Sequence, residues 1–338
     1  GAPRRPRKLP PRFGHDTFTG RMMYMFDQFD PRPLLATQKQ LEQAKQLVER
    51  YRNWQVEPEE ETLRRAQKLV EVSLHPDTKE PIPWPFRVSA FLVIGPPIGL
   101  GLIQPNASIA SVAFWQWANQ THAACLNYAN RPIASNAFGK SSEMMNIPNL
   151  NGGAPIQIEN RALISYMGAV GSAMAVSLSV RSLSMHLKNK AMLLLAPVCG
   201  VISASVANLY LTRQHELSEG IEVCDPETNE CLGKSKVAAK KALIETAISR
   251  AVLPLPAIGL TPFMFQYLNS AAWYRSLGTV GALSVRYVGL LTMTWATVPP
   301  SFALFPHRGS LPLSRLEPEV QRAGSRVNCT EVSYNKGL

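Results

Sequence analysis

Residues 88–130 read VSAFLVIGPPIGLGLIQPNASIASVAFWQWANQTHAACLNYAN, and this stretch decides the fold. It lies between Arg87 and Arg131 and contains no Asp, Glu, Lys or Arg. A helix that crosses a membrane needs about 20 predominantly apolar residues. The stretch is therefore long enough for one crossing and a second helix, and its apolar first half predicts entry into a membrane.

The second half of this stretch is uncharged but polar. Polar side chains at bilayer depth are costly unless they face protein or a water-filled cavity. We therefore expect a helix that faces the interior of a bundle and lines the path of a substrate. An alternative is that the polar groups only hydrogen-bond neighbouring helices. The candidate lining residues are Gln116, Asn119, Gln120, His122 and Asn127.

Prolines inside apolar segments predict breaks in two of the membrane helices. The pair Pro96 and Pro97 lies in the first segment, and the pair Pro254 and Pro256 lies in a later one. A break frees backbone groups, which a membrane tolerates only where protein or a cavity satisfies them. Transporters place substrates at such breaks, although a kinked helix that only packs is an equal alternative.

Two further residues are candidates for contact with a substrate. Asn208 lies on the later turns of a predicted span and could bind a polar ligand or hydrogen-bond a neighbouring helix. Arg250 lies at the mouth of another span, where it could pair with a carboxylate ligand or with a lipid phosphate.

Charge-free windows recur along the rest of the chain, although the mean hydropathy of −0.06 is close to zero. This alternation with charged segments is typical of a protein that crosses a membrane several times. We predict an all-α, polytopic transmembrane bundle of about five crossings, with some helices broken by proline. Six crossings result if residues 88–130 pass twice. The later windows are 162–180, 191–212, 251–274 and 288–305.

The composition divides the chain into four predicted parts. Helical periodicity over 37–54 and 59–74, with Thr37 as a cap, predicts an αα-hairpin outside the bilayer. Polar residues around Pro226 predict a turn or hairpin, and 234–250 an amphipathic surface helix. The parts are a basic, Pro-rich strap over 1–36, the hairpin and its following turn over 37–86, a transmembrane domain over 87–306 and a polar tail over 307–338.

The net charge of +11 could suggest a nucleic-acid partner. No aromatic-interleaved basic stripe and no zinc-finger spacing supports that reading. We expect no nucleic-acid partner and attribute the basic excess to contact with anionic lipid. Cys224 and Cys231 share a polar loop, where a disulfide and two free thiols are both open possibilities.

Motifs that would indicate catalysis are not found in the sequence. There is no P-loop, dinucleotide-binding glycine pattern or nucleophile elbow. No pair of carboxylates lies within an apolar window, so general acid–base chemistry has no evident site. We therefore predict no enzyme activity, no catalytic residues, no metal site and no cofactor.

Several motifs along nearly the whole chain resemble the sideroflexin family, and most closely its sideroflexin-5 branch. The matching residues are His75-Pro76-Asp77-Thr78, Phe114-Trp115-Gln116-Trp117 with Asn119-Gln120, Asn127-Tyr128-Ala129-Asn130-Arg131, Gly220-Ile221, the region of Arg250, Pro254 and Pro256, Leu316-Glu317-Pro318-Glu319, and Asn335-Lys336-Gly337-Leu338. The resemblance implies about five transmembrane helices, location in the mitochondrial inner membrane and transport of a small amino acid, typically serine. The sideroflexin-5 branch has also been linked to citrate-type substrates.

The sequence departs from the family pattern in two places. The glycine that usually follows the His-Pro-Asp-Thr motif is Lys79, and the loop 132–160 is longer than usual. The resemblance also implies an alternative function, as an accessory subunit or assembly factor of a respiratory complex. In that case the strap 1–36 and the longer loop would be the docking parts.

Overall fold

The computed structural model describes residues 7, 9–10, 12–14, 17–75, 78–104, 107–130, 144–147, 156–226, 228, 230–304, 308–326 and 329–336. Its chain forms two compact units, and each is considered by itself. The first unit comprises Gly1–Asn106, Thr121–Ser135 and Leu260–Leu304. The second comprises Ala107–Gln120, Asn136–Gly259 and Phe305–Leu338.

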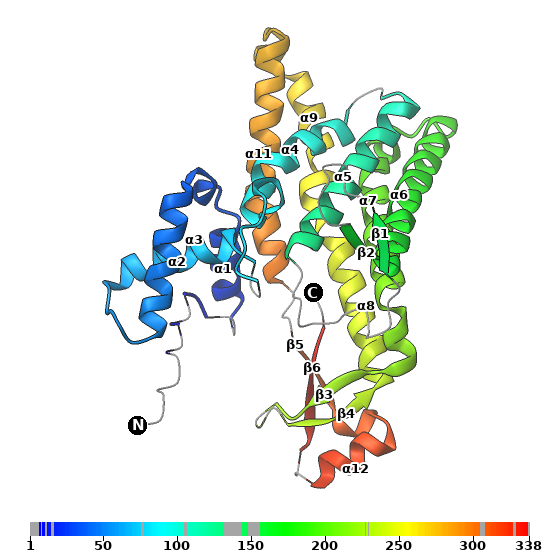
Figure 1. The fold of residues 1–338 in the computed structure, drawn as a ribbon. Helices are drawn as coiled ribbons and strands as arrows, with labels where there is room; N and C mark the ends of the chain where they lie inside the picture. The colour runs from blue at the N-terminus through cyan, green and yellow to red at the C-terminus, as the bar shows by residue number, and fades with distance from the viewer. Residues whose placement is uncertain are drawn as a thin grey trace. The chain divides into compact units, whose positions relative to one another are not determined.

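In the first unit, the predicted helical hairpin consists of α2 (Gln38–Arg52) and α3 (Glu60–Ser73) (Figure 1). Thr37 begins α2 with a capping box, in which its hydroxyl accepts from the backbone of Gln40 and the Gln40 side chain accepts from the backbone of Thr37. The two helices bury a small apolar cluster between them, as the 3- and 4-residue spacing predicts. Its buried members are Ala44, Val48 and Ala66.

The N-terminal strap is partly helical and packs on its own unit. Its helix α1 (Phe18–Gln28) lies against α11 (Thr279–Ala303). The ring of Phe26 is 5.0 Å from that of Trp295, and the ring of Phe29 is 5.8 Å from that of Phe302. Phe26 and Phe29 of the strap therefore pack against aromatic residues of the same chain.

A cluster of charges fixes the end of α1 to the hairpin. Lys68 of α3 forms ion pairs with both Asp27 and Asp30, and Arg32, in the 3-10 turn Arg32–Leu35, forms another with Asp30. Burial by itself would raise the pKa of Asp30. The hydrogen bonds from Arg32 and Lys68 outweigh burial and hold that pKa well below its usual range.

The predicted break at Pro96 and Pro97 is wrong. Both prolines lie inside α4 (Phe91–Leu102), which runs through them after two 3-10 turns at Trp84–Phe86 and Val88–Ala90. The φ angle that proline fixes is close to the helical value, so only two backbone hydrogen bonds are lost. Close packing compensates this loss, since a Cβ on Gly99 would lie 2.8 Å from Leu290 Cδ2 of α11.

The rest of the first unit is a helical hairpin around a short turn. Helix α9 (Thr261–Ser270) is followed by α10 (Ala272–Arg275) and then by α11. Helix α9 packs on α11 near Gly289, where a Cβ would lie 2.9 Å from Met264 Cε. The predicted span 288–305 thus lies almost wholly within a longer helix that begins at Thr279.

The second unit is built on two long helices that lie side by side, α6 (Asn160–His186) and α7 (Lys190–Glu219) (Figure 1). Small residues permit this close packing, as is common between membrane helices. Among the small residues of α6, Gly168 and Ala173 face α7, whereas Gly171 and Ala175 are exposed. The buried residues of α6 are Ser165, Ala169, Ala173, Ser177 and Ser184.

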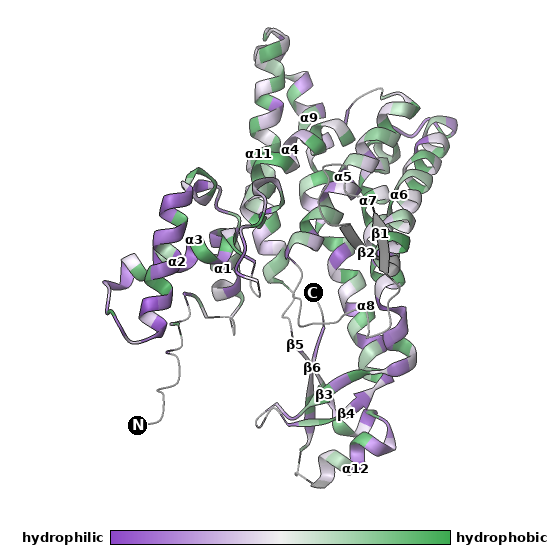
Figure 2. Cartoon of the chain, viewed as in Figure 1, coloured by the Kyte–Doolittle hydropathy of each residue, from purple (hydrophilic) through white to green (hydrophobic). Residues whose placement is uncertain are grey.

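Three segments of the described chain are long and apolar enough to cross a membrane. They are Ala162–His186, Lys190–Glu219 and Lys236–Ser270, and Val88–Leu102 is a shorter apolar helix. Figure 2 shows the apolar character of α6 and α7. The helical fold class is confirmed and is compatible with a membrane bundle. The number of about five crossings stays a prediction.

The third of these segments is interrupted near its middle, at the predicted proline pair. Helix α8 (Lys236–Val252) ends just before Pro254, and a π-helical turn, Leu255–Gly259, contains Pro256. Regular α-helix resumes at Thr261. The amphipathic helix predicted over 234–250 is α8, in which Ala238, Ala239 and Ala242 are buried whereas Ile244 and Ile248 are exposed.

A four-stranded antiparallel sheet contains the hairpin predicted around Pro226, which is confirmed, whereas its other two strands were not predicted. Its order is β4-β3-β6-β5, formed by β3 (Ile221–Cys224), β4 (Cys231–Ser235), β5 (Arg308–Pro312) and β6 (Glu331–Asn335). A two-stranded sheet of β1 (Met144–Ile147) and β2 (Ile156–Glu159) lies within the longer loop, most of which is outside the described residues.

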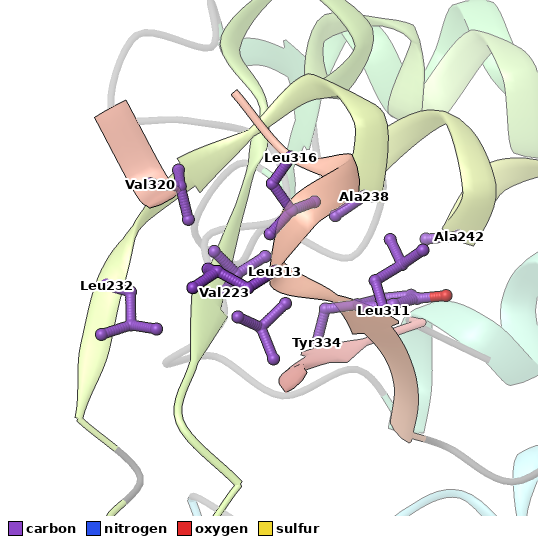
Figure 3. Close-up of a cluster of buried hydrophobic side chains, with 10 residues drawn as sticks. Val223, Leu232, Ala238, Ala242, Leu311, Leu313, Leu316, Val320 and Tyr334 are labelled. Atoms are coloured by element: carbon purple, nitrogen blue, oxygen red, sulfur yellow. The ribbon is translucent and has the colours of Figure 1, made fainter. Parts of the chain in front are cut away.

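The tail after residue 307 is therefore part of a core and not a separate polar segment. Between β5 and β6 it forms the 3-10 turn Leu313–Arg315 and α12 (Pro318–Arg326). Side chains from β3, β5, α8 and α12 meet in one apolar cluster (Figure 3). Along β6 every second residue points to the same face, as in any strand, so Val332 and Tyr334 are buried together.

The end of β6 is fastened to two helices of the same unit. The carbonyl oxygen of Lys336 accepts hydrogen bonds from Arg213 of α7, at 2.5 Å, and from Thr246 of α8, at 3.0 Å. Its Nζ lies 2.8 Å from Glu245 Oε2. These contacts hold Lys336 against both α7 and α8.

Candidate functional site

Gln116 provides a polar junction of three helices in the second unit. It lies on α5 (Ile109–Asn130), and its side chain is only 1% exposed. Its Nε2 donates to Ser177 Oγ of α6, at 2.6 Å, and to the carbonyl oxygen of Pro197 of α7, at 3.2 Å. One amide therefore joins α5 to both long helices.

The other half of the Gln116 amide is buried without a partner. Its Oε1 has no hydrogen-bond partner among the described residues. A buried polar atom left unpaired destabilises a protein by about 1–3 kcal/mol. Such an atom persists where it serves a purpose, and an acceptor of this kind can bind an ammonium or hydroxyl group of a small ligand.

Gly200 makes the junction possible. A Cβ at this position would lie 1.9 Å from Ser177 Oγ, 2.8 Å from Gln116 Nε2 and 2.8 Å from the carbonyl oxygen of Ala173. Any side chain would displace the two polar groups or the backbone of α6. Only glycine therefore fits between α6 and α7 at the level of Gln116.

Pro197 adds a second feature to the junction. It lies inside α7, where its nitrogen cannot donate to the carbonyl of Leu193 one turn earlier. Ser177 Oγ donates in turn to the carbonyl oxygen of Ala196, at 3.3 Å. Two backbone carbonyls of α7 thus accept hydrogen bonds from this polar cluster. We call the cluster the Gln116 site (Gln116, Ser177, Pro197 and Gly200).

The other predicted residues of α5 divide between the two units. Gln120 is buried at 7% exposure one turn from Gln116, and Asn119 is half-buried; both pack in the second unit. His122 belongs to the first unit, where its Nε2 lies 3.2 Å from the carbonyl oxygen of Pro85. Asn127 is exposed. The structure thus supports a structural role for His122 and brings only the earlier amides near Gln116.

Asn208 and Arg250 lie apart from the Gln116 site. Asn208 is half-buried on α7, about 16 Å along the helix from Pro197 at 1.5 Å per residue. Arg250 is half-buried on α8, within electrostatic range of Arg213. Arg213 forms an ion pair with Glu216 at 2.7 Å. Arg250 forms no ion pair with a carboxylate among the described residues.

The His75–Thr78 motif forms a closed turn in the first unit. The backbone of Thr78 donates to His75 Nδ1 at 3.3 Å, and that of His75 donates to the Glu80 carbonyl at 2.9 Å. Pro76 and Asp77 lie outside the described residues. Lys79 has a φ of 58°, in the left-handed region that favours glycine. This backbone angle explains why the resemblance leads one to expect glycine at this position.

Three residues at these sites were not among the predicted ones. Ser177 and Gly200 become recognisable only when α6 and α7 are paired, although both are small residues in apolar windows. Arg286 lies inside α11, two residues before the predicted window 288–305. The sequence contains no Asp or Glu between Glu245 and Glu317. This absence could have indicated that Arg286 has no nearby carboxylate in the sequence and must be stabilised by other groups.

Arg286 is held by aromatic rings in the first unit. Its guanidinium carbon lies 5.7 Å from the ring centre of Phe265 and 5.9 Å from that of Tyr274. Its terminal nitrogen donates to Asn269 Oδ1 at 3.2 Å, and its Nε is buried without a partner among the described residues. Cation–π contacts and one neutral amide thus replace the carboxylate that a buried arginine usually has.

A family model described as Sideroflexins matches residues 9–143 and 137–338. The chain belongs to the sideroflexin family. This sideroflexin is 38% identical to Sideroflexin-5 of Rattus norvegicus over 97% of its own chain and 91% of the relative. It is 37% identical to Sideroflexin-5 of Homo sapiens over 97% and 92% of the two chains.

A more distant relative shows how widely the similarity extends. This sideroflexin is 34% identical to the protein named Sideroflexin of Dictyostelium discoideum, over 97% of its own chain and 96% of the relative. The comparison with solved structures finds no match. Membership of the family supports a transport role in mitochondria.

Proposed function

We propose that this sideroflexin carries a small amino acid, serine or one like it, across the mitochondrial inner membrane. The observation that carries the proposal is the half-satisfied amide of Gln116, buried at the junction of α5 with two membrane-length helices. Family membership supports the transport role, and the chemistry of the junction supports the class of substrate.

The chemistry of the Gln116 site suits a small zwitterion. An ammonium group needs acceptors that are oriented and shielded from water. The unpaired Oε1 of Gln116 is such an acceptor, buried between α5 and the two long helices. The hydroxyl of a serine could exchange with that of Ser177 as a partner of Nε2.

Movement of substrate past this site requires the helices to separate and close again. Gly200 and the small residues of α6 leave few interdigitated side chains between the two helices. Separating α6 from α7 breaks the hydrogen bond from Ser177 Oγ to the Ala196 carbonyl oxygen and the apolar contacts of Ala169, Ala173 and Ala204. Moving α5 away breaks the two hydrogen bonds of Gln116, each worth about 1 kcal/mol net, which a polar substrate can replace.

The test is uptake of radiolabelled L-serine into proteoliposomes that contain the purified full chain and anionic lipid. We expect saturable uptake by the wild type. Gln116→Leu keeps the volume of the side chain and removes both polar groups, so we expect serine uptake to fall by about tenfold or more. The matched control is Asn127→Ala, an exposed amide on the same helix, which should retain uptake.

Two results would count against the proposal. One is the lack of saturable serine uptake by a wild-type protein whose circular dichroism shows intact helices. The other is wild-type uptake by Gln116→Leu and by the pair Asn119→Ala with Gln120→Ala. Competition by unlabelled alanine, glycine and citrate then separates an amino-acid carrier from a carrier of citrate-type substrates.

The alternative role, in a respiratory complex, stays a prediction of the sequence. One of its two docking parts, the strap 1–36, uses Phe26 and Phe29 to pack on α11 and α4 of its own unit. Native-gel migration in mild detergent tests this role. Comigration with a respiratory complex would favour it, whereas a small free species favours the carrier.

A further inference from the structure

The β3–β4 pair places two cysteines directly opposite each other. Cys224 of β3 pairs in register with Cys231 of β4, and their Sγ atoms lie 3.0 Å apart. Both are free thiols. The site lies in the sheet of the second unit and does not depend on the transport function proposed above.

Backbone geometry at this pair suits a covalent bond. The neighbouring pair is joined by a hydrogen bond from the Asp225 nitrogen to the Glu230 carbonyl oxygen, at 2.9 Å. In a regular antiparallel ladder the next pair, Cys224 and Cys231, is of the non-hydrogen-bonded type, whose Cα atoms are about 4.5 Å apart, and the register shifts just beyond it, between Val223 and Cys224. That Cα separation is within the range of disulfides, so the bond requires the Sγ atoms to approach each other by only about 1 Å.

The surrounding contacts hold the two thiols in this position. Thr228 Oγ1 donates to Asp225 Oδ2 at 2.8 Å and accepts from the backbone of Glu230 at 3.2 Å, which ties Thr228 to the residues that follow β3 and precede β4. On the other side of β3, Ser333 Oγ of β6 donates to the carbonyl oxygen of Cys224 at 3.3 Å. The thiols are therefore preorganised by the sheet.

The two thiols differ in access. Cys231 is exposed, whereas Cys224 is half-buried. Burial, and then the hydrogen bond with Cys231, raise the pKa of Cys224 to about 11. A thiolate is the nucleophile in disulfide exchange. Cys231 is thus the thiol that reacts first with a reagent from solution. Cys224 is the thiol that then attacks the mixed disulfide formed on Cys231.

We propose that Cys224 and Cys231 form a thiol–disulfide exchange site whose reaction partner is a disulfide, such as oxidised glutathione. The Cys231 thiolate attacks one sulfur of the reagent, forms a mixed disulfide and releases one thiolate. Cys224, deprotonated, then attacks Cys231 Sγ and releases the second. The two protein thiols lose two electrons and two protons, and the reagent is reduced to two thiols.

The bond would close the hairpin that connects α7 to α8. Strand β3 begins two residues after α7 ends, and α8 follows directly on β4. The same sheet receives β6, whose end is fastened to both helices through Lys336. Oxidation therefore stiffens the connection between two membrane-length segments at the sheet side of the second unit.

The test uses the purified full chain in detergent, incubated with oxidised glutathione at several ratios to reduced glutathione and then trapped with N-ethylmaleimide. We expect five maleimide adducts in the reduced protein and three in the oxidised one, because only two of the five cysteines pair. Peptide mapping should find the peptide or peptides containing Cys224 and Cys231 linked, without glutathione attached. Cleavage in the loop between them should become about tenfold slower.

Variants supply the controls. Cys231→Ser should abolish the loss of two adducts, and Cys224→Ser should instead leave glutathione attached to Cys231. Cys329→Ser is the matched control from the same sheet region and should oxidise as the wild type does. A glutathione adduct that persists on wild-type Cys231, a bond between two chains, or five adducts at every ratio would each overturn the proposal.

Discussion

Gln116 Nε2 lies 2.6 Å from Ser177 Oγ, and this bond joins α5 to α6 where Gly200 lets α7 approach both. The bond is buried, so water does not compete for it. It is also the contact around which the proposed substrate site is built.

The first prediction concerns Gly200→Ala. The added Cβ would lie 1.9 Å from Ser177 Oγ and 2.8 Å from a backbone oxygen of α6, so α6 and α7 must move apart. We expect a net destabilisation of about 1–2 kcal/mol, since overpacking outweighs the better helix propensity of alanine. Serine uptake should fall with it. The measurements are the thermal midpoint in detergent and proteoliposome uptake.

Gly171→Ala is the matched control for this change. Gly171 lies on α6 within the same helix pair, but a Cβ there meets nothing within 4 Å. It should be neutral or slightly stabilising. A second substitution, Ser177→Gly, removes the closest contact and should restore part of the stability of Gly200→Ala. Equal effects of the two glycine substitutions would show that packing at Gly200 does not matter.

The second prediction concerns Lys79, whose φ is 58°. A side chain in the left-handed region costs about 1–2 kcal/mol, and glycine avoids this but loses more chain entropy on folding. We expect Lys79→Gly to stabilise the first unit by up to about 1 kcal/mol. Lys79→Ala keeps the unfavourable φ and removes the charge. If alanine stabilises as much as glycine, the cause is the charge and not the backbone.

The third prediction concerns Asp30, whose pKa is held below its usual range by Arg32 and Lys68 despite burial. A depressed carboxyl pKa stabilises the fold above the unfolded pKa of about 4, and this contribution is lost as the pH falls through the folded value. We expect Asp30→Asn to cost about 2 kcal/mol at pH 7 and progressively less below pH 4.

Thermal unfolding monitored by tryptophan fluorescence at pH 7, 5 and 3 measures this effect. The matched control is Glu61→Gln, which breaks an exposed ion pair between Glu61 and Arg65 on α3. Exposed pairs contribute little, so this variant should unfold like the wild type at every pH. A pH-independent loss in Asp30→Asn would contradict the electrostatic explanation.

The fourth prediction concerns Arg286, which lies over the rings of Phe265 and Tyr274. Lysine keeps the charge but not the planar group that stacks on the rings and donates to Asn269. We expect Arg286→Lys to destabilise the protein by about 1 kcal/mol. Arg275→Lys, at an exposed site on α10, should have no effect in the same thermal assay. Equal midpoints for the two variants would exclude a stabilising role of the rings.

The sequence located the helices well because the signals for them are local. Charge-free windows, the Thr37 cap and the small residues of α6 each act within a few turns of one helix. The proline rule failed at Pro96 because packing of Gly99 against Leu290 of α11 outweighs the two missing backbone bonds. A contact between distant segments decided that outcome.

The candidate site was predictable only in part, for the same reason. Gln116 and Gln120 could be chosen from the sequence because uncharged amides in an apolar window need an internal partner. The partner itself, Ser177, is an ordinary small residue until α6 packs against α5. Arg286 was missed because a charge at the edge of an apolar window resembles a loop residue.

By itself, the sequence determined that this chain is helical, apolar enough for a membrane and related to the sideroflexins. Only the tertiary structure decided that the tail from Arg308 to Asn335 completes a sheet with β3 and that Gln116 joins three helices. The physical reason is the range of the interactions. Helices form from hydrogen bonds and periodicity within one segment, whereas strand pairing and a buried amide's partner depend on residues that are distant in the chain.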